Sequence, residues 1–414
     1  MKRPLDVAFF ISTFGLLINQ FYPYPMTLPP RLSEVYSYFQ HGDLHLGYRR
    51  LLDAAIETND FDIYEHTLNF SDWYDAYNTS STPDLTVIAE KVQQLLEQIE
   101  RCYQQIDITP GSIKLKAEGI SKQYRKGHFN LSKLDVTLHT SHIIGLVGEN
   151  GNGKTTLLRL LYGDLKADTG KIEYYFPDTK DSFYDIKSKI AFIPQRPSPW
   201  YGSLLSNLQY ASTFAGLKGK KNMLWTDMVI ARMGLRPYRT YTWNTLSSGY
   251  KMRFELARAL MCRPEVLLLD EPLANLDMLA QLIVLEDLRF LSRSQSIPLS
   301  IMLSSQQLYE VEKVSDDVIF LQRGMARYQK NEMESQEKRD SLVLELETTE
   351  SREVLKDILN NCRLQKLSFN GGVYILYFPE DVQLKEVLVT IGKSGLPVKY
   401  LRDISLSSRR FFDA

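Results

Sequence analysis

The chain is poor in cysteine and histidine, and it lacks long apolar runs. Its three cysteines, Cys102, Cys262 and Cys362, are odd in number and widely spaced. That pattern excludes a disulfide framework and a Cys-x-x-Cys metal site, and it is typical of a reducing cytosol. No segment approaches the roughly 20 apolar residues that a membrane-spanning helix needs. The last of the six histidines is His142, so every motif after that position lacks one.

Neither charge is in excess, because 49 basic and 50 acidic residues give the 414-residue chain a formal net charge of −1. This balance argues against a protein built mainly to coat nucleic acid. The balance is not uniform, however: residues 1–110 carry 7 basic and 15 acidic side chains, whereas residues 111–414 carry 42 and 35. At roughly 150 residues per domain, the length and the two opposite net charges predict two or three globular domains.

The N-terminal region, residues 1–110, is predicted to be a helical module. Apolar residues recur at helical spacing over residues 32–39, 44–55, 61–77 and 87–99. An earlier apolar run, Val7–Ile18, follows Lys2 and Arg3 as in a signal peptide, but it lacks a cleavage site and is too short to cross a bilayer. We expect that run to be buried or docked on a surface, with membrane or targeting use as the alternative. The acidic, aromatic helices are either a simple packed core or a docking surface.

After a predicted linker at residues 108–112, short apolar strands alternate with helical stretches, which is typical of an α/β domain. The apolar run 143–147 leads into a phosphate loop with the spacing G-x-x-x-x-G-K-[ST]. In such a loop the curled backbone directs N–H groups at phosphate oxygens, the lysine reaches the β- and γ-phosphates, and the hydroxyl ligates Mg²⁺. The loop predicts a nucleoside triphosphate site formed by Gly148, Asn150, Gly151, Asn152, Gly153, Lys154, Thr155 and Thr156.

Two adjacent acids, Asp270 and Glu271, end a second apolar run that starts at Val266. Carboxylates at the end of a buried strand are costly unless a metal or water uses them. We expect Asp270 to hold Mg²⁺ through water and Glu271 to polarise the attacking water.

Two further segments lie between the phosphate loop and these acids. The signature segment, Leu246-Ser247-Ser248-Gly249-Tyr250, opens a helical stretch, and Gln195 follows the apolar run 191–193. A serine at the start of a helix is, in isolation, most simply an N-cap. The position of Ser247 between the loop and the acids favours a nucleotide contact instead.

Along the chain the motifs come in the order phosphate loop, Gln195, signature segment, acidic strand and Ala274-Asn275-Leu276-Asp277. This ordered set resembles the nucleotide-binding subunits of ATP-binding cassette (ABC) proteins. The resemblance covers about residues 113–325. It implies a P-loop NTPase, with a RecA-like α/β core and a helical subdomain around residues 200–262. It also implies ATP and Mg²⁺ as cofactors, with Thr155, Gln195 and Asp270 at the metal.

The resemblance further implies a head-to-tail dimer, either a homodimer or a heterodimer. Ser247, Ser248 and Gly249 of one subunit would face the γ-phosphate held by the other subunit's Lys154. Asp277 would belong to the loop that crosses the interface. Tyr124 matches the aromatic residue that stacks on adenine, although packing on a strand would explain a lone tyrosine as well.

Two departures from the family pattern affect the predicted chemistry. The family's signature usually reads Leu-Ser-Gly-Gly-Gln, where this chain has Ser248 and Tyr250. More importantly, Gln306 stands where the family has a histidine that contacts the γ-phosphate. A glutamine amide donates a hydrogen bond but carries no charge. We therefore predict an ATPase with Glu271, Gln306 and Lys154 as catalytic residues, and hydrolysis that is slow or dependent on a partner.

The C-terminal region is predicted to be a separate small α+β domain. Residues 326–339 are polar and charged and predict a linker, so the domains would cover residues 1–110, 111–328 and 340–414. The order strand–helix–strand–strand–helix–strand follows, with a hairpin turn at Asn370-Gly371-Gly372, which suggests a ferredoxin-like fold. It resembles the C-terminal extension of some exporter ATPases, and dimerisation or regulation is its expected role.

The first hypothesis is the ATPase subunit of an exporter, paired with a separately encoded permease whose coupling helix meets residues 197–214. Such a subunit would be cytoplasmic and peripheral on the inner face of the membrane. The alternatives are a soluble ABC ATPase that acts on the ribosome or nucleic acid, and a nucleotide-gated scaffold with weak hydrolysis. No dense basic run favours a nucleic-acid partner, and the sequence does not indicate the cargo.

Overall fold

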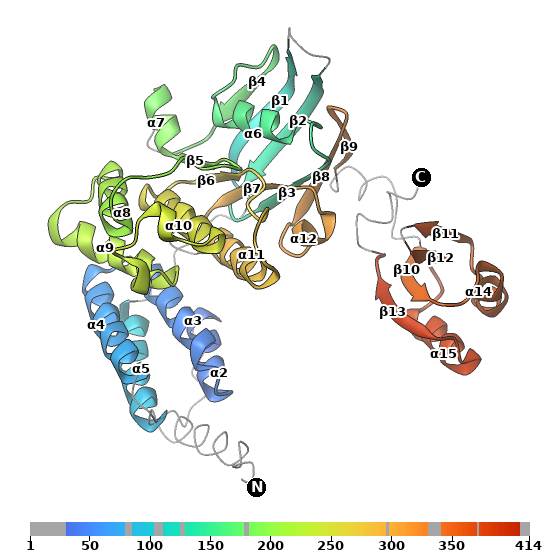
Figure 1. Ribbon diagram of the computed structural model, residues 1–414, viewed down its shortest axis with the longest axis horizontal. Helices are drawn as coiled ribbons and strands as arrows, with labels where there is room; N and C mark the ends of the chain where they lie inside the picture. Colours follow the sequence, from blue (N-terminus) through green and yellow to red (C-terminus); the bar gives the residue numbers. More distant parts are fainter. Residues whose placement is uncertain are drawn as a thin grey trace. The chain divides into compact units, whose positions relative to one another are not determined.

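The computed structural model describes residues 30–78, 85–102, 111–124, 129–177, 182–294, 298–329, 341–370 and 372–405 (Figure 1). The predicted docked run Val7–Ile18 lies outside these residues. So do most of the linker at 108–112 and Gly371 of the predicted hairpin turn. The three predicted domain boundaries remain predictions.

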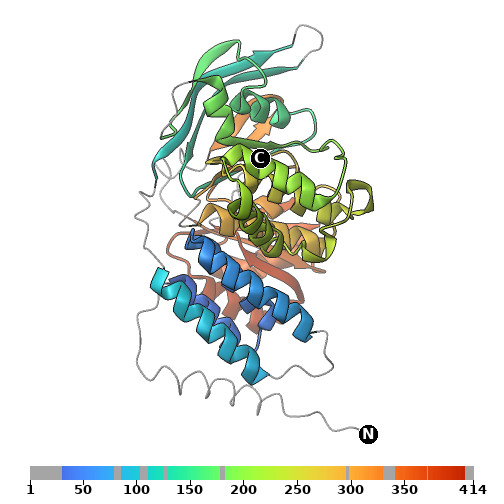
Figure 2. The ribbon, with the colours of Figure 1, turned by 90° about the vertical axis from the view of Figure 1, so that its left-hand side faces the viewer.

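Within the N-terminal region, the described residues 30–78 and 85–102 form four helices, as the apolar periodicity predicts: α2 (Pro30–Gln40), α3 (Leu44–Glu57), α4 (Phe61–Asn78) and α5 (Leu85–Cys102). They run side by side in both views (Figures 1 and 2). Their apolar faces meet in the interior, where Val35, Leu51, Leu52 and Ile88 are fully buried. Asp43 is the N-cap of α3: its side chain accepts a hydrogen bond from the Leu46 N–H at 3.0 Å.

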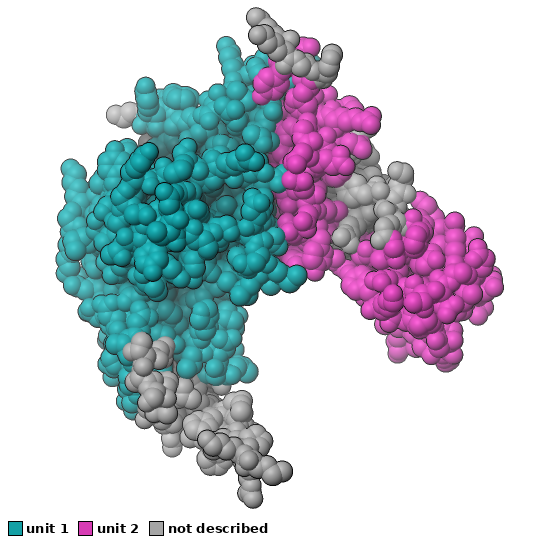
Figure 3. Space-filling view, viewed as in Figure 1, with its two compact units in different colours: residues 1–122, 133–143, 155–303 teal, residues 123–132, 144–154, 304–414 magenta. Residues whose placement is uncertain are grey.

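The chain divides into two compact units (Figure 3). The first comprises residues 1–122, 133–143 and 155–303, and the second comprises residues 123–132, 144–154 and 304–414. A six-stranded sheet has the strand order β5-β6-β7-β3-β8-β9. Its strands are β3 (Ile143–Val147), β5 (Ile190–Ile193), β6 (Val266–Leu269), β7 (Ser300–Ser305), β8 (Asp317–Gln322) and β9 (Met325–Gln329).

The sheet is mainly parallel, as alternating strands and helices predict. Strands β5, β6 and β7 pair in parallel in the first unit, and β3 pairs in parallel with β8 in the second. Every residue of β3 and β6 is buried, which is typical of parallel strands covered on both faces. A second sheet has the order β2-β1-β4, with β1 (Ile113–Gln123), β2 (Asn130–His139) and β4 (Thr169–Tyr174).

Helices connect these strands, and three of them form the predicted subdomain around residues 200–262. The helices are α6 (Lys154–Tyr162), α7 (Phe183–Ser188), α8 (Leu204–Ser212), α9 (Gly219–Arg232), α10 (Ser248–Met261), α11 (Met278–Ser292) and α12 (Leu308–Glu312). Helix α10 packs against α8 and α9, and α9 also packs against α3 and α4 of the N-terminal helices. Within the described residues, we find no helix with both the length and the apolar character needed to span a membrane.

The predicted linker at residues 326–339 is wrong at its start, because β9 covers Met325–Gln329. Strand β9 pairs antiparallel with β8, from Ile319 opposite Gln329 to Gln322 opposite Met325. It lies at the end of the strand order, and an edge strand tolerates polar and charged residues that a central strand excludes. The polar composition was therefore a poor guide to the backbone conformation here.

The C-terminal residues contain the predicted order of strands and helices: β10 (Ser341–Thr348), α14 (Arg352–Leu359), β11 (Lys366–Asn370), β12 (Val373–Pro379), α15 (Leu384–Ser394) and β13 (Val398–Asp403). All pairs in the sheet β11-β12-β10-β13 are antiparallel. This is the split βαβ arrangement of ferredoxin-like domains. Leu344, Leu355, Phe378 and Val387 are fully buried between sheet and helices, and Cys362 is buried in the same core as a free thiol.

Candidate functional site

The phosphate loop joins β3 to α6 and depends on glycine at defined points. Gly151 and Gly153 have φ angles of +82° and +103°, in the region that favours glycine. A Cβ atom on Gly148 would lie 2.4 Å from the backbone oxygen of Leu321, and one on Gly153 would lie 2.6 Å from the ring of Phe129. The backbone thus follows a path that side chains at these positions would block.

Lys154 extends back over the loop that precedes it. Its Nζ donates to the carbonyl oxygens of Gly148 at 2.6 Å and Glu149 at 3.2 Å. Only 5% of the residue is exposed, so its ammonium charge is confined to the loop. The Asn152 side chain accepts from the Arg323 N–H at 3.0 Å, which gives it a structural role in the turn.

Thr155 and Asp270 meet although 115 positions separate them. The Thr155 hydroxyl donates to Asp270 Oδ2 at 2.8 Å, and Asp270 is 3% exposed at the end of β6. The Asp270 N–H donates to the Ile193 carbonyl at 2.9 Å, which joins the ends of β6 and β5. Gln195 follows β5 by two residues and is exposed. A hydroxyl beside a carboxylate is a pair of oxygen ligands that suits Mg²⁺, and Gln195 follows the strand that pairs with β6.

Glu271 begins a tight turn two residues after the end of β6. Its φ angle is +49°, which is unusual for a residue with a side chain and costs on the order of 1 kcal/mol. The turn is closed by a hydrogen bond from the Ala274 N–H to the Glu271 carbonyl at 3.1 Å. Asp277 then caps α11, because its Oδ1 accepts from the Ala280 N–H at 2.9 Å.

The signature segment starts α10, and Ser247 is its N-cap. The Ser247 hydroxyl accepts from the Tyr250 N–H at 3.4 Å, so the simple capping role is present. Ser247 and Ser248 are exposed and accessible to a second molecule. A Cβ on Gly249 would lie 3.2 Å from the Cβ of Ala280, so the first turns of α10 and α11 are in close contact.

Gln306 directly follows β7 and is exposed. The preceding carbonyl, that of Ser305, accepts from the Gly148 N–H at 3.3 Å, so Gln306 begins beside the phosphate loop. The Ser305 hydroxyl accepts from the Gln307 N–H at 3.0 Å and donates to Glu310 Oε2 at 3.1 Å. These bonds fix the turn that carries Gln306.

Tyr124 lies at the end of β1, where its N–H donates to the Phe129 carbonyl at 3.5 Å. The two rings are 6.3 Å apart and tilted, and Tyr124 is 37% exposed. The exposed fraction leaves ring surface that a base could cover.

Comparison with known proteins identifies the family. The sequence pattern of the family "ABC transporter" matches residues 131–274. An ABC transporter ATP-binding protein of Listeria monocytogenes serotype 4b (strain F2365) is 30% identical over 217 residues, which cover 51% of this chain and 79% of that protein. The chain belongs to the ATP-binding proteins of ABC transporters.

Two other ABC relatives give a similar match. The ABC transporter ATP-binding protein NatA of Bacillus subtilis (strain 168) is 29% identical over 197 residues, 47% of this chain and 79% of NatA. The bacitracin transport ATP-binding protein BcrA of Enterococcus faecalis is 24% identical over 300 residues, 72% of this chain and 94% of BcrA. The predicted family and P-loop α/β fold are confirmed, and ATP is the nucleotide of this family.

A further polar cluster in this ABC protein gave no signal in the sequence. Glu255 of α10 is fully buried and accepts from the indole N–H of Trp200 at 3.1 Å and from Arg258 at 2.5 Å. The Arg258 guanidinium lies over the Trp200 ring at 4.4 Å. Burial raises the pKa of Glu255, although Arg258 opposes that shift. The cluster joins the segment after Gln195 to the helix that carries the signature.

Proposed function

We propose that this chain hydrolyses MgATP as the ATP-binding subunit of an ABC exporter and drives a separately encoded permease. The observation that carries the proposal is the 2.8 Å hydrogen bond between the Thr155 hydroxyl and Asp270. It places the hydroxyl of the phosphate loop beside the carboxylate of the acidic strand, as a shared magnesium site requires.

The residues present fit both ATP and Mg²⁺. Phosphate oxygens would replace the carbonyls that Lys154 now contacts, because an ammonium binds an anion more strongly than a neutral acceptor. No group of three or more His, Cys, Asp or Glu side chains suited to a metal occurs among the described residues. Mg²⁺ needs no such group, since one or two carboxylates usually hold it together with phosphate, water and other oxygen ligands. Thr155 and Asp270, with Gln195, would supply those ligands.

The proposed catalytic roles of Glu271 and Gln306 follow from their positions in the turns after β6 and β7. When bound, Mg²⁺ would neutralise charge on the phosphates. Glu271, in a strained turn beside Asp270, would polarise the attacking water. Gln306 would donate a neutral hydrogen bond to the γ-phosphate where a histidine would supply a charge, so we expect slow turnover.

Dimerisation around ATP is part of the proposal. Ser247 and Ser248 are exposed, and the N-terminus of α10 carries the partial positive charge that attracts phosphate. Together with Gly249 they would face the nucleotide of a second subunit, with Asp277 at the interface. Tyr124 would stack on the adenine of its own subunit.

A membrane permease would receive the motion of this dimer. The segment 197–214 carries the exposed aromatic residues Tyr201, Tyr210 and Phe214, which suit a hydrophobic partner. We therefore place the protein on the cytoplasmic face of a membrane, with the C-terminal β10–β13 region in dimerisation or regulation. BcrA, a bacitracin transport protein by its name, favours transport over the ribosome or nucleic-acid alternative. A pull-down from detergent-solubilised membranes should retain a multi-spanning protein; recovery of ribosomes instead would contradict the proposal.

Phosphate release by the purified chain tests the enzymatic part. Wild type should hydrolyse ATP slowly, and Glu271→Gln should lower turnover by about 100-fold or more, the usual weight of a general base. Gln306→His should raise turnover, because an imidazolium adds charge at the γ-phosphate. Gln307→His, at the exposed neighbouring residue, is the matched control. An unchanged rate in Gln306→His would show that this glutamine does not slow hydrolysis. Absence of turnover in wild type would instead favour the nucleotide-gated scaffold.

A further inference from the structure

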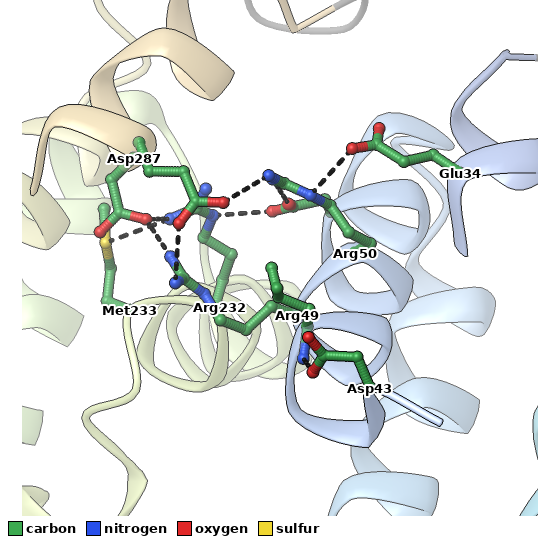
Figure 4. Close-up of polar contacts among 10 residues, drawn as sticks. Glu34, Asp43, Arg49, Arg50, Arg232, Met233 and Asp287 are labelled. Carbon is green, nitrogen blue, oxygen red and sulfur yellow. Dashed lines mark hydrogen bonds and ion pairs between the residues drawn. The ribbon is translucent and has the colours of Figure 1, made fainter. Parts of the chain in front are cut away.

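A cluster of charged side chains joins helix α3 of the N-terminal region to α9 and α11 (Figure 4). Arg232, the last residue of α9, donates from Nε to Asp53 of α3 at 2.8 Å. The same guanidinium donates from Nη1 to Asp287 of α11 at 2.5 Å. Asp287 also accepts from Arg49 of α3. One arginine of the ATPase subdomain thus holds carboxylates from two other helices.

The centre of this cluster is excluded from water. The side chains of Arg232, Asp53 and Asp287 are 3%, 2% and 1% exposed. Burial disfavours the charge on Arg232, but the two carboxylates outweigh burial and raise the pKa of its guanidinium. The ring of Phe290 covers the guanidinium at 4.9 Å. Buried ion pairs of this kind hold a fixed geometry, because a displaced charge would lack a partner.

A partly exposed layer from α3 closes the cluster. Arg50 bonds Asp53 at 3.0 Å and Glu286 of α11 at 2.7 Å, and it reaches Glu34 of α2 at 3.2 Å. Without the N-terminal helices, Arg232 would lose one carboxylate and Asp287 would lose one cation. The N-terminal helices therefore complete the charge balance of the ATPase itself.

The cluster acts on the two helices whose first turns lie in the proposed dimer site. Helix α9 packs on α10, whose N-cap is Ser247, and the N-cap of α11 is Asp277. The first turns of α10 and α11 touch at Gly249 and Ala280. The spacing of α9 from α11 at Arg232 and Asp287 thus affects how the signature segment meets the turn before α11.

We propose that Asp53 and Arg49 are positioning residues of the ATPase: they hold Arg232 against Asp287 and thereby fix the placement of the signature segment relative to Asp277. The N-terminal helices are on this view an internal brace of the catalytic unit. The kinetic consequence rests on the proposed ATP hydrolysis, whereas the placement of the helices does not.

Two variants of the full-length chain test the brace. Asp53→Asn keeps the shape of the side chain but removes the charge opposite Arg232. Arg49→Gln is milder, because Arg232 keeps both of its carboxylates. Glu65→Gln is the matched control: it breaks the 2.7 Å ion pair with Lys220, which also joins the N-terminal helices to α9 but is 40% and 68% exposed. Circular dichroism establishes that each variant is folded.

The first readout is steady-state ATP hydrolysis. We expect kcat to fall about fivefold or more in Asp53→Asn and less in Arg49→Gln. KM should stay within about twofold, because the phosphate loop is not part of the cluster. Glu65→Gln should match wild type. A loss of folded protein would by itself lower the apparent kcat and leave KM unchanged. We therefore calculate kcat from the concentration of folded protein, and only a fall that remains after this correction supports the proposal.

The second readout is amide hydrogen exchange, which needs no ATP turnover. The Tyr250 N–H, bonded to Ser247, and the Ala280 N–H, bonded to Asp277, should exchange about fivefold faster in Asp53→Asn. Strand β12 should be unchanged. Unaltered exchange at both amides in folded Asp53→Asn would overturn the proposal. If Asp53→Asn does not fold, the same exchange measurement on Arg49→Gln tests the proposal instead. If the wild-type protein shows no ATPase activity, the proposed function is refuted. Hydrogen exchange would still test whether Asp53 and Arg49 fix the placement of the signature segment.

Discussion

Arg232 provides a sharp stability prediction, because Arg232→Met keeps much of the side-chain volume but removes the charge. Its Nε and Nη1 hydrogen bonds end on carboxylates that are 2% and 1% exposed. Removal of one partner from a buried ion pair costs about 3–5 kcal/mol, and the lost contact with the Phe290 ring adds up to about 1 kcal/mol. Arg49 and Arg50 stay beside Asp287 and Asp53 and offset part of this loss. The expected loss in free energy of unfolding is therefore about 3 kcal/mol, at the low end of the range for a broken pair.

Urea unfolding measures this loss. At a slope of about 2 kcal/mol per molar urea, 3 kcal/mol lowers the midpoint by about 1.5 M. The chain's four tryptophans, among them Trp225, which is buried on the same helix as Arg232 beside Tyr64, all lie in the first unit. Intrinsic tryptophan fluorescence therefore follows the transition in that unit. The control is Lys220→Met, whose partner Glu65 is exposed, so the cost should stay below about 1 kcal/mol. A loss below about 1 kcal/mol in Arg232→Met would refute the reasoning, since Arg49 and Arg50 would then suffice to neutralise both carboxylates.

Three further predictions follow from contacts already described. Gly148→Ala should weaken binding of a fluorescent ADP analogue by more than about tenfold, because its Cβ would clash with the Leu321 backbone at 2.4 Å; wild-type affinity would disprove the clash. Burial raises the pKa of Glu255, so wild-type stability relative to Glu255→Gln should fall as the pH rises above the ordinary glutamate pKa of about 4.3. The prediction is wrong if the urea midpoints of wild type and Glu255→Gln differ by a constant amount across that pH range. Burial also raises the pKa of the Cys262 thiol, so iodoacetamide should modify it more slowly than glutathione at the same pH.

Local pattern predicted most elements of this fold. The apolar runs at 143–147 and 266–269 are the buried strands β3 and β6, and helical spacing located α2 to α5. These segments are predictable because burial selects apolar residues at the period of the backbone. Strand β9 was missed, because an edge strand has less of its surface buried and its sequence carries little periodicity.

The sequence predicted those parts of the candidate site whose residues occur at a characteristic spacing along the chain. Glycines at 148, 151 and 153 occupy positions that the backbone path of the loop requires, and Thr155 meets Asp270. The roles of Lys154, Glu271, Gln306 and the signature segment remain predictions. Phe129 under Gly153 and Trp200 on Glu255 gave no signal, because each contact joins segments whose separation is set only by packing.

The sequence by itself determined the family, the phosphate loop and the order of the strands and helices, because each depends on a few neighbouring residues and on the geometry of the backbone. Only the tertiary structure decided where the charges of the N-terminal helices lie. In the sequence, Arg49, Arg50 and Asp53 are ordinary charged residues of a helix. Asp53 lies 179 positions from Arg232, and packing of α3 against α9 and α11 buries both. Burial converts these charges from solvated side chains into fixed contacts, and nothing in the local sequence encodes it.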